Sequence, residues 1–318
     1  MLNQPIQKKI CDILGKRTIA NVDTFKTVWS GFGSLHRIEF NGCYKPVVVK
    51  SICEPNHINH PKGWSSHFAS ARKLKSYRVE QAFYREFAKK ANAKTPAYLG
   101  FIEGENTQYL LLEDLAAAGY HDIVEPDIVT VKKILVWLAD FHAQHLNTTC
   151  EELWPQGSYW HLATRPDEFT AMSHTELKKH ARALDCKLQD CVFQTLIHGD
   201  AKLANFMQSA TDIAGYDFQY VGRGVGIVDV MLLISSAFTS DQCFAYEKEL
   251  LAHYEAAFLS NCERYSINLA EEVINQWLAL YPIAWADFAR FLNGWSPGHW
   301  KLHDYAWHQV QQAVQLVK

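Results

Sequence analysis

Long apolar runs are missing from this 318-residue sequence. No segment approaches the roughly 18 uninterrupted apolar residues that a membrane-spanning helix needs, and the N-terminus, MLNQPIQKK, has no apolar core behind its charges. A strong net charge is missing too, because 31 Lys and Arg residues face 34 Asp and Glu residues, which leaves a charge of -3. So weak a field concentrates neither a nucleic acid nor an anionic membrane. We therefore expect a cytoplasmic protein that binds neither, and nothing in the sequence indicates an obligate protein partner.

Paired cysteines and internal repeats are also missing. The eight cysteines include no Cys-x-x-Cys pair, which argues against a zinc ribbon or a redox dithiol and favours reduced thiols. The composition that is present, 48% hydrophobic and 20% charged residues, is typical of a packed globular chain. Its length allows one large or two modest globular units.

The first third of the chain is predicted to form short strands with one helix. The dipeptide Asn41-Gly42 joins two β-rich runs and favours a hairpin, because both residues tolerate positive φ. A second hairpin is expected around residues 103–106, and the proline- and glycine-containing stretch 51–75 is expected to be a long loop. The strands are predicted at 24–29, 35–40, 45–50, 97–102 and 108–112, and the helix at 76–92.

The remainder is predicted to be mainly helical, with short strands only around 196–218. A β-rich first third followed by helices indicates an α+β fold of two lobes, which we place at 1–115 and 116–318. The helices are predicted at 127–145, 167–185, 228–239, 241–260, 269–292 and 301–317.

Polar residues in the segment that interrupts the helices carry the chemistry. Residues 197–205 read IHGDAKLAN, and DFQ follows at 217–219. Phosphoryl transfer needs a base beside the attacking hydroxyl and oxygen ligands for magnesium. We expect Asp200 to take the proton of a substrate hydroxyl, and Asn205 and Asp217 to hold Mg²⁺. A loop from Asp200 to Asn205 can turn both side chains toward one point, and a strand at 213–218 can bring Asp217 alongside.

This run resembles the catalytic loop of the aminoglycoside phosphotransferase and choline kinase superfamily, which is itself similar to that of protein kinases. The strand VVVK ending at Lys50 resembles the one that carries the phosphate-binding lysine, and Glu80 resembles its helix partner. The segment LLLEDL at 110–115 resembles the hinge where adenine docks, which implies roles for Glu113 and Leu115. The resemblance covers about residues 25–240 and is closest to the ecdysteroid kinase-like branch.

The resemblance implies a bilobal protein kinase-like fold that uses ATP and Mg²⁺. The small antiparallel-sheet lobe, 1–115, is expected to bind nucleotide, and the large helical lobe, 116–318, to hold the catalytic residues and the acceptor. A Gly-x-Gly loop, Gly31 to Gly33, is expected to approach the phosphates, together with the backbone amide of Ser34.

Several polar residues near these motifs have alternative interpretations. Lys202 is expected to neutralise the transferring phosphoryl group, although a solvated loop lysine is the alternative. Glu86, on the same predicted helix as Glu80, is the rival partner of Lys50. His198 is expected to brace the loop rather than to catalyse. Asp229, inside an apolar run, is expected to brace the loop's backbone amides, because an unpaired carboxylate there would be costly.

The acceptor is predicted to be a small molecule. Only eleven residues separate Asp217 from Asp229, and the Ala-Pro-Glu ending of a protein kinase's peptide platform is missing. The aromatic-rich segment 262–318 is expected to line the acceptor pocket, with Trp285 and Trp295 as candidates, although core packing is the default for such residues. A hydrophobic or sterol-like alcohol is favoured, and a choline-like amino alcohol is the second choice. The alternatives are an aminoglycoside-type antibiotic kinase and a non-catalytic ATP-binding pseudokinase.

Overall fold

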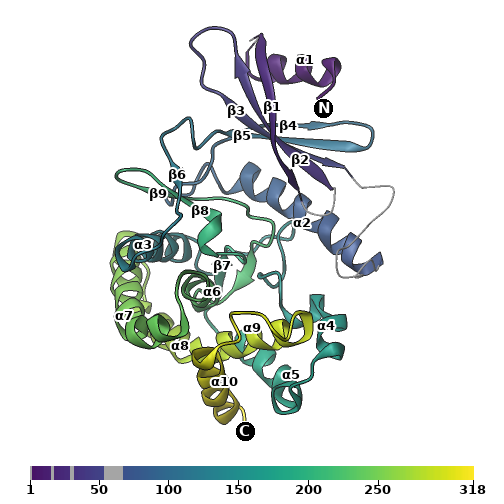
Figure 1. Cartoon of the computed structure of the whole chain (residues 1–318). Helices are drawn as coiled ribbons and strands as arrows, with labels where there is room; N and C mark the ends of the chain where they lie inside the picture. The colour runs from purple at the N-terminus through teal and green to yellow at the C-terminus, as the bar shows by residue number, and fades with distance from the viewer. Residues whose placement is uncertain (1, 16–17, 29–31, 54–66) are drawn as a thin grey trace. The chain divides into compact units, whose positions relative to one another are not determined.

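The computed structural model describes residues 2–15, 18–28, 32–53 and 67–318 (Figure 1). The chain divides into two compact units. The N-terminal unit comprises Met1–Lys90 and Thr95–His121, and the C-terminal unit comprises Ala91–Lys94 and Asp122–Lys318. None of the helices in the described ranges is long and apolar enough to cross a membrane.

The N-terminal unit is built on a five-stranded antiparallel sheet in the order β1-β2-β3-β5-β4. The predicted hairpin is confirmed: β2 and β3 pair in antiparallel register, and Gly42 in their connection has a φ of 93°. The strands are β1 (Ile19–Val28), β2 (Gly33–Phe40), β3 (Val47–Cys53), β4 (Tyr98–Glu103) and β5 (Thr107–Glu113).

One face of this sheet is closed by a helix that the sequence reading did not include. Helix α1 (Gln4–Ile13) begins at Asn3, whose side chain accepts a hydrogen bond from the backbone N–H of Ile6 at 3.1 Å. Its buried residues, Ile6 and Ile10, join a hydrophobic cluster with Ile38, Val49 and Leu111 from the sheet. Apolar burial of this kind is the main force that holds the helix on the sheet.

The helix expected at 76–92 is shifted toward the N-terminus. Helix α2 runs over His67–Glu86, so its first residues overlap the stretch expected to be a loop. Of that stretch, residues 54–66 lie outside the described residues. On the buried side of α2, Tyr77, Phe83 and Tyr84 are almost completely enclosed.

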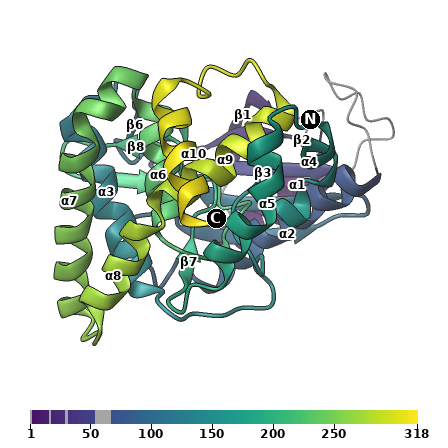
Figure 2. The ribbon, with the colours of Figure 1, turned by 90° about the horizontal axis from the view of Figure 1, so that it is seen from below.

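In the C-terminal unit, α9 contacts five other helices, namely α4, α5, α6, α8 and α10. In Figure 2, α3 and α7 lie side by side, in agreement with their extensive contact. Two short antiparallel pairs, β7 with β10 and β8 with β9, stand among the helices. The helices are α3 (Ile128–Gln144), α4 (Pro166–Ala171), α5 (Thr175–Gln189), α6 (Ile227–Ala237), α7 (Ser240–Arg264), α8 (Ala270–Ala279), α9 (Tyr281–Trp295) and α10 (Asp304–Leu316).

The short elements of the chain lie between these helices. The strands are β6 (His121–Asp122), β7 (Thr195–Ile197), β8 (Phe206–Gln208), β9 (Ile213–Gly215) and β10 (Gly222–Gly224). Two single-turn 3₁₀ helices, η2 (Leu162–Thr164) and η3 (Leu203–Asn205), complete the unit. An α+β fold with an antiparallel sheet followed by a helical part is thereby confirmed.

Two of the predicted long helices are each broken into two. The helix expected at 167–185 is interrupted because His174 caps α5, accepting from the Leu177 N–H at 3.1 Å, while the Asn293 side chain accepts from the Ser173 N–H at 3.0 Å. The helix expected at 269–292 is interrupted at Leu280, and Pro282 in the first turn of α9 lacks the N–H that would continue α8.

Gly294 provides a test of how α9 packs on α4. A Cβ at Gly294 would lie 1.8 Å from the Glu168 carbonyl oxygen, whereas a Cβ at Gly298 would meet nothing within 4 Å. We expect Gly294→Ala to lower the free energy of unfolding by about 1–3 kcal/mol, because backbone must move to admit the methyl group. That cost outweighs the helix propensity of about 1 kcal/mol that alanine adds. Chemical denaturation should show Gly298→Ala near wild type; equal effects would contradict the close packing.

Candidate active site

The loop that follows β7 places Asp200 in the C-terminal unit. Gly199 has a φ of 76°, and a Cβ there would lie 2.1 Å from the Tyr220 carbonyl oxygen and 2.7 Å from the Ser158 backbone nitrogen. Only glycine fits so crowded a left-handed position. Asp200 directly follows this sharp turn, and its side chain is about nine-tenths buried.

Asp229 on α6 fixes the backbone of this loop. Its Oδ2 accepts a hydrogen bond from the His198 N–H at 2.5 Å, and its Oδ1 accepts from the Gly199 N–H at 3.0 Å. The His142 imidazole also contacts Oδ2, at 3.1 Å. The carboxylate is completely buried, so these partners offset the cost of removing it from water. The predicted brace for the loop amides is thereby confirmed.

His198 supports the same loop from within. Its Nδ1 accepts from the Asp200 backbone N–H at 3.3 Å, so its Nε2 carries the proton and donates to the Tyr216 carbonyl at 3.0 Å. The imidazole packs against Phe218, with ring centroids 4.5 Å apart, and has no exposed surface. Both ring nitrogens are therefore used in bracing the backbone, as the sequence predicted.

Asp200 is joined to Lys202 and Asn205 by hydrogen bonds. The Lys202 Nζ donates to the Asp200 Oδ2 at 2.7 Å, and the Asn205 Nδ2 donates to the same oxygen at 3.0 Å. The other oxygen, Oδ1, is buried and has no hydrogen-bond partner. Burial raises the pKa of the Asp200 carboxyl, an effect that the charge of Lys202 opposes. One carboxylate oxygen thus remains available to receive a proton.

Asn205 and Asp217 have the chemistry of a magnesium site. The Asn205 Nδ2 also donates to the Asp200 carbonyl at 2.7 Å, which leaves the Oδ1 of Asn205 as a ligand oxygen. Asp217 lies close enough for its charge to raise the pKa of Asp200. No group of three or more His, Cys, Asp or Glu side chains that could hold a metal occurs among the described residues. Two protein oxygen ligands would suit Mg²⁺, which keeps several waters and binds substrate phosphates, so the assignment of Asn205 and Asp217 to the metal stays a prediction.

The sequence predicted that Asp217 lies on a strand at 213–218, but the structure places it after the strand has ended. Strand β9 ends at Gly215, and Asp217 has a φ of 69°, the left-handed region that aspartate tolerates better than most residues. The Gln219 Nε2 donates to the Asp217 Oδ1 at 2.6 Å. Gln219 thus positions the Asp217 side chain, a role that was not predicted from the sequence. Its place in the DFQ triplet with Asp217 is the signal that could have identified it.

In the N-terminal unit, Lys50 pairs with Glu80. The Lys50 Nζ lies 2.6 Å from the Glu80 Oε2, and both side chains are buried. The lysine also lies 5.5 Å from the centroid of the Tyr77 ring. Glu86, the rival, instead pairs with Arg85 at the exposed end of α2. The structure thus forms the first of the two alternative pairs.

The expected phosphate loop is only partly described. Gly31 lies outside the described residues. Gly33 opens β2, where a Cβ would lie 1.8 Å from the Ser51 carbonyl oxygen, so glycine is needed for the close approach of β3. The Ser34 N–H donates to the Ser51 Oγ at 3.3 Å, so that amide would have to exchange this partner for a phosphate.

The predicted hinge residues lie at the end of β5. The Glu113 N–H donates to the Ala97 carbonyl at 2.9 Å, and its side chain accepts from the Ala97 N–H at 3.0 Å. Leu115 is buried, and its carbonyl accepts from the Tyr120 N–H at 3.0 Å. The role of this segment in adenine binding stays a prediction.

The two tryptophans expected to line an acceptor pocket differ. Trp285 has no exposed surface and packs against Tyr305, with ring centroids 5.2 Å apart, so it belongs to the core. This corrects its assignment to the acceptor, because packing of α9 against α10 encloses the indole. Trp295, the last residue of α9, is half-buried and stacks on Phe291 at 5.7 Å.

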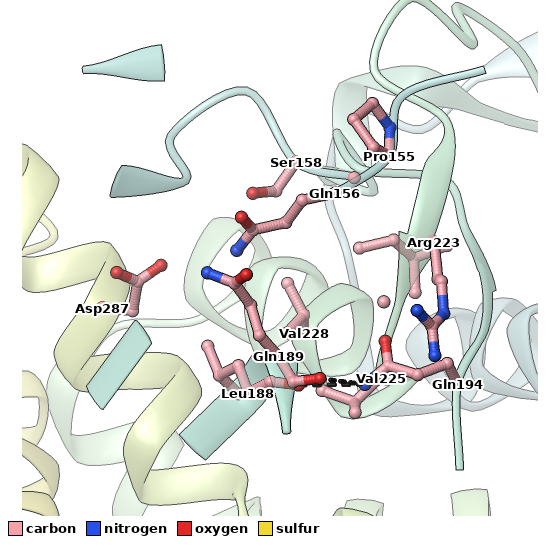
Figure 3. Close-up of a pocket in the computed structure, with 13 residues that line it drawn as sticks. Pro155, Gln156, Ser158, Leu188, Gln189, Gln194, Arg223, Val225, Val228 and Asp287 are labelled. Carbon is pink, nitrogen blue, oxygen red and sulfur yellow. Dashed lines mark hydrogen bonds between the residues drawn. The ribbon is translucent and has the colours of Figure 1, made fainter. Parts of the chain in front are cut away.

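The C-terminal unit also holds a pocket that contains none of the predicted catalytic residues. Its volume is about 90 Å³, and its polar lining includes Gln156, Gln189, Arg223 and Asp287 (Figure 3). Gln194 is tied to α5 by a hydrogen bond to the Leu188 carbonyl at 3.0 Å. The acidic side chain of the lining, Asp287, already has a partner, because it accepts a hydrogen bond from Arg290 at 2.8 Å.

Comparison with known proteins identifies related sequences and folds. The model of the APH phosphotransferase enzyme family matches residues 60–265. A choline kinase from Cryptosporidium parvum Iowa II has a TM-score of 0.56 and 10% identity over 97% of this chain and 94% of that one. An ethanolamine kinase from Plasmodium vivax has a TM-score of 0.53 and 12% identity over 92% of this chain and 81% of that one.

An amicoumacin kinase in complex with AMP-PNP, Ca²⁺ and Ami is also similar, with a TM-score of 0.50 and 12% identity over 98% of this chain and 92% of that one. At such identities these likenesses establish a shared fold. A search of curated proteins finds no match. The kinase-like fold expected from the sequence is therefore confirmed, whereas the ecdysteroid kinase-like branch stays a prediction.

Glu80 and Glu86, which lie on the same helix, allow a matched test of the buried ion pair between Lys50 and Glu80. We expect Glu80→Ala to destabilise the N-terminal unit by on the order of 3 kcal/mol, because it leaves the buried Lys50 ammonium without its carboxylate. It should also weaken nucleotide binding. Glu86→Ala removes a half-exposed carboxylate from the same helix and should change either quantity little. Thermal unfolding and nucleotide titration measure both effects, and the reverse ranking would move the functional pair to Glu86.

Asp217 offers a test of the metal site. Asparagine tolerates the same left-handed backbone, so Asp217→Asn removes the charge without adding strain. We expect it to weaken Mg²⁺-dependent binding of a non-hydrolysable ATP analogue by about tenfold or more, since even changes outside the ligand shell cost that much. Calorimetry with and without Mg²⁺ measures this. Asp190→Asn, at an exposed helix end, is the control; unchanged binding in Asp217→Asn would remove this residue from the metal site.

Proposed function

The chain belongs to the phosphotransferase enzyme family, and from this premise we propose that it transfers the γ-phosphoryl group of ATP to a hydroxyl of a small molecule, with Asp200 as general base. The observation that carries the proposal is the unpartnered, buried Oδ1 of Asp200. Its other oxygen is held by Lys202 and Asn205, so the carboxylate is oriented before a substrate arrives. Preorganisation of this kind costs no rearrangement during the reaction.

The proposed reaction begins when Asp200 accepts a hydrogen bond from the acceptor hydroxyl. As the oxygen attacks the γ-phosphorus, its proton passes to Oδ1, and the bond between the γ-phosphorus and the bridging oxygen of ADP breaks. The Lys202 ammonium stabilises negative charge on the transferring group. Burial lowers the pKa of Lys202, but the hydrogen bond and charge of Asp200, together with the charge of Asp217, raise it above its usual value, so the lysine keeps its charge.

The nucleotide and metal are assigned to two sets of residues. Lys50, oriented by Glu80, is proposed to bind phosphate oxygens of ATP, and the loop residues Gly31, Gly33 and Ser34 are assigned to the same phosphates. Asn205 and Asp217 are proposed to hold Mg²⁺, which when bound neutralises charge on the phosphates. The adenine contact is assigned to the segment that contains Glu113 and Leu115, by resemblance to the family.

A small acceptor is supported by the short connection after Asp217. Strand β10 follows at Gly222–Gly224, and α6 begins at Ile227, so the chain has no length in which to form a peptide platform. Tyr159 is half-buried, and its pKa is raised by burial and then by the charge of Asp200, so its ring supplies an aromatic surface near the base. Phe291 packs edge-on against it, at 5.6 Å between centroids. A hydrophobic alcohol fits this aromatic wall.

Asp200→Asn tests the proposed base. The amide keeps the size of the side chain but cannot take a proton, so kcat should fall by about 10²- to 10⁴-fold. Affinity for ATP should stay nearly unchanged, because the nucleotide and metal ligands are other residues. Steady-state kinetics with a known acceptor, and calorimetry with ATP, measure the two quantities. Asp212→Asn, at an exposed turn, is the control. Wild-type turnover in Asp200→Asn would place the base elsewhere.

A further inference from the structure

A buried lysine in the C-terminal unit lacks a carboxylate partner. Lys301, which precedes α10, is 8% exposed, and its Nζ donates to the Ser235 Oγ at 3.3 Å. That is its one hydrogen bond in the described part of the chain, and no Asp or Glu oxygen there lies within 4.0 Å of it. An ammonium has three hydrogen-bond donors. Two therefore have no hydrogen-bond partner within the described part of the chain, and a buried charge is costly without such partners.

Lys301 lies beside the catalytic loop. Ser235 and Ser236 are adjacent near the end of α6, and the Ser236 Oγ accepts a hydrogen bond from the backbone N–H of Leu203, in the same loop as Asp200, at 2.8 Å. Burial lowers the pKa of Lys301 to about 8, the charge of Asp200 raises it, and that of Lys202 lowers it. The Lys301 amine thus responds to both charged groups of the proposed catalytic centre.

Aromatic rings border the amine on the side that reaches solvent. The Nζ lies 5.4 Å from the centroids of both Phe288 and Trp300. Phe288 is buried, whereas Trp300 is 59% exposed. The lysine is therefore in contact with α6 through Ser235 and with α9 through Phe288, and an exposed indole lies at its edge.

We propose that Lys301 recognises the acceptor, and that the acceptor is an alcohol that carries a carboxylate. The proposal rests on the proposed function, because it takes Asp200 as the point at which the hydroxyl binds. An oxyanion would satisfy the unused donors of Lys301 and balance its buried charge. A cationic acceptor would instead place like charges together, so amino alcohols and aminoglycosides are disfavoured.

Three series of alcohols test the charge preference on the wild-type enzyme. The three series use the same hydroxylated skeletons and differ only in the end group, which is a carboxylate in the first, a neutral amide in the second and a trimethylammonium group in the third. We expect kcat/KM to be highest for the carboxylate and to differ by about 10- to 100-fold from the ammonium, the range for hydrogen bonds to charged groups. A preference for the ammonium would overturn the role of Lys301 and leave the phosphotransferase function intact. No turnover with any alcohol would overturn the proposed function itself.

Lys301→Gln separates acceptor binding from nucleotide binding. For the carboxylate series its acceptor KM should rise about 10- to 100-fold, while KM for ATP and the turnover of the amide series stay near wild type. Lys248→Gln, an exposed lysine on α7, is the control. A raised KM for ATP would assign Lys301 to the phosphates and contradict the proposal. Thermal unfolding checks that the variant folds, and the wild-type series decides if it does not.

The pH profile gives an independent readout. Lys301 is charged below about pH 8, so kcat/KM for the carboxylate series should fall as the pH rises through that value. Neighbouring groups titrate elsewhere: burial raises the pKa of Cys243 to about 12 and lowers that of His303, while that of Lys202 is raised. Lys301→Arg should remove this limb, because arginine keeps its charge. The same limb in Lys301→Arg would assign it to another group.

Discussion

The carboxylate of Asp229 is the interaction on which the catalytic loop depends. It accepts from two successive backbone amides, those of His198 and Gly199, and from the His142 ring. That ring in turn contacts the Tyr254 hydroxyl at 2.8 Å, so α3, α6 and α7 are joined to one loop. An ionised group without solvent contact is stable only with such partners. The left-handed turn at Gly199, and with it the position of Asp200, follows from this anchor.

The parts of the site that are close in sequence could be predicted from it. Asp200, Lys202 and Asn205 occupy one short loop, so their spacing alone limits how far apart they can lie, and the structure joins them by hydrogen bonds. The hairpin at Gly42 was predictable for the same reason, because local backbone preferences decide it. The pairing of Lys50 with Glu80 needed family resemblance, since residues on a strand and a later helix meet only after folding.

Features that depend on tertiary packing could not be predicted. Trp285 is enclosed because α9 packs against α10, and its residue type is the same as that of the exposed Trp300. The φ of 69° at Asp217 is set by the loop after β9, which period and propensity do not reveal. Likewise, no sequence pattern distinguishes Lys301 from an exposed lysine, whereas the structure places it against Ser235 and two aromatic rings. The roles of these residues depend on their burial, and burial is decided by the fold and not by residue type.

Three charged side chains of the C-terminal unit interact with the carboxylate of Asp200. Lys202 donates a hydrogen bond to Asp200, the charge of Asp217 raises the pKa of Asp200, and the charge of Asp200 raises the pKa of Lys301. In the proposed account these groups bind, in turn, the transferring phosphoryl group, the metal and the acceptor. Phosphorus NMR of the enzyme with ATP, Mg²⁺ and an alcohol that stimulates turnover tests this most directly. The account predicts ADP and a phosphate monoester of the alcohol; ADP with inorganic phosphate alone would contradict it.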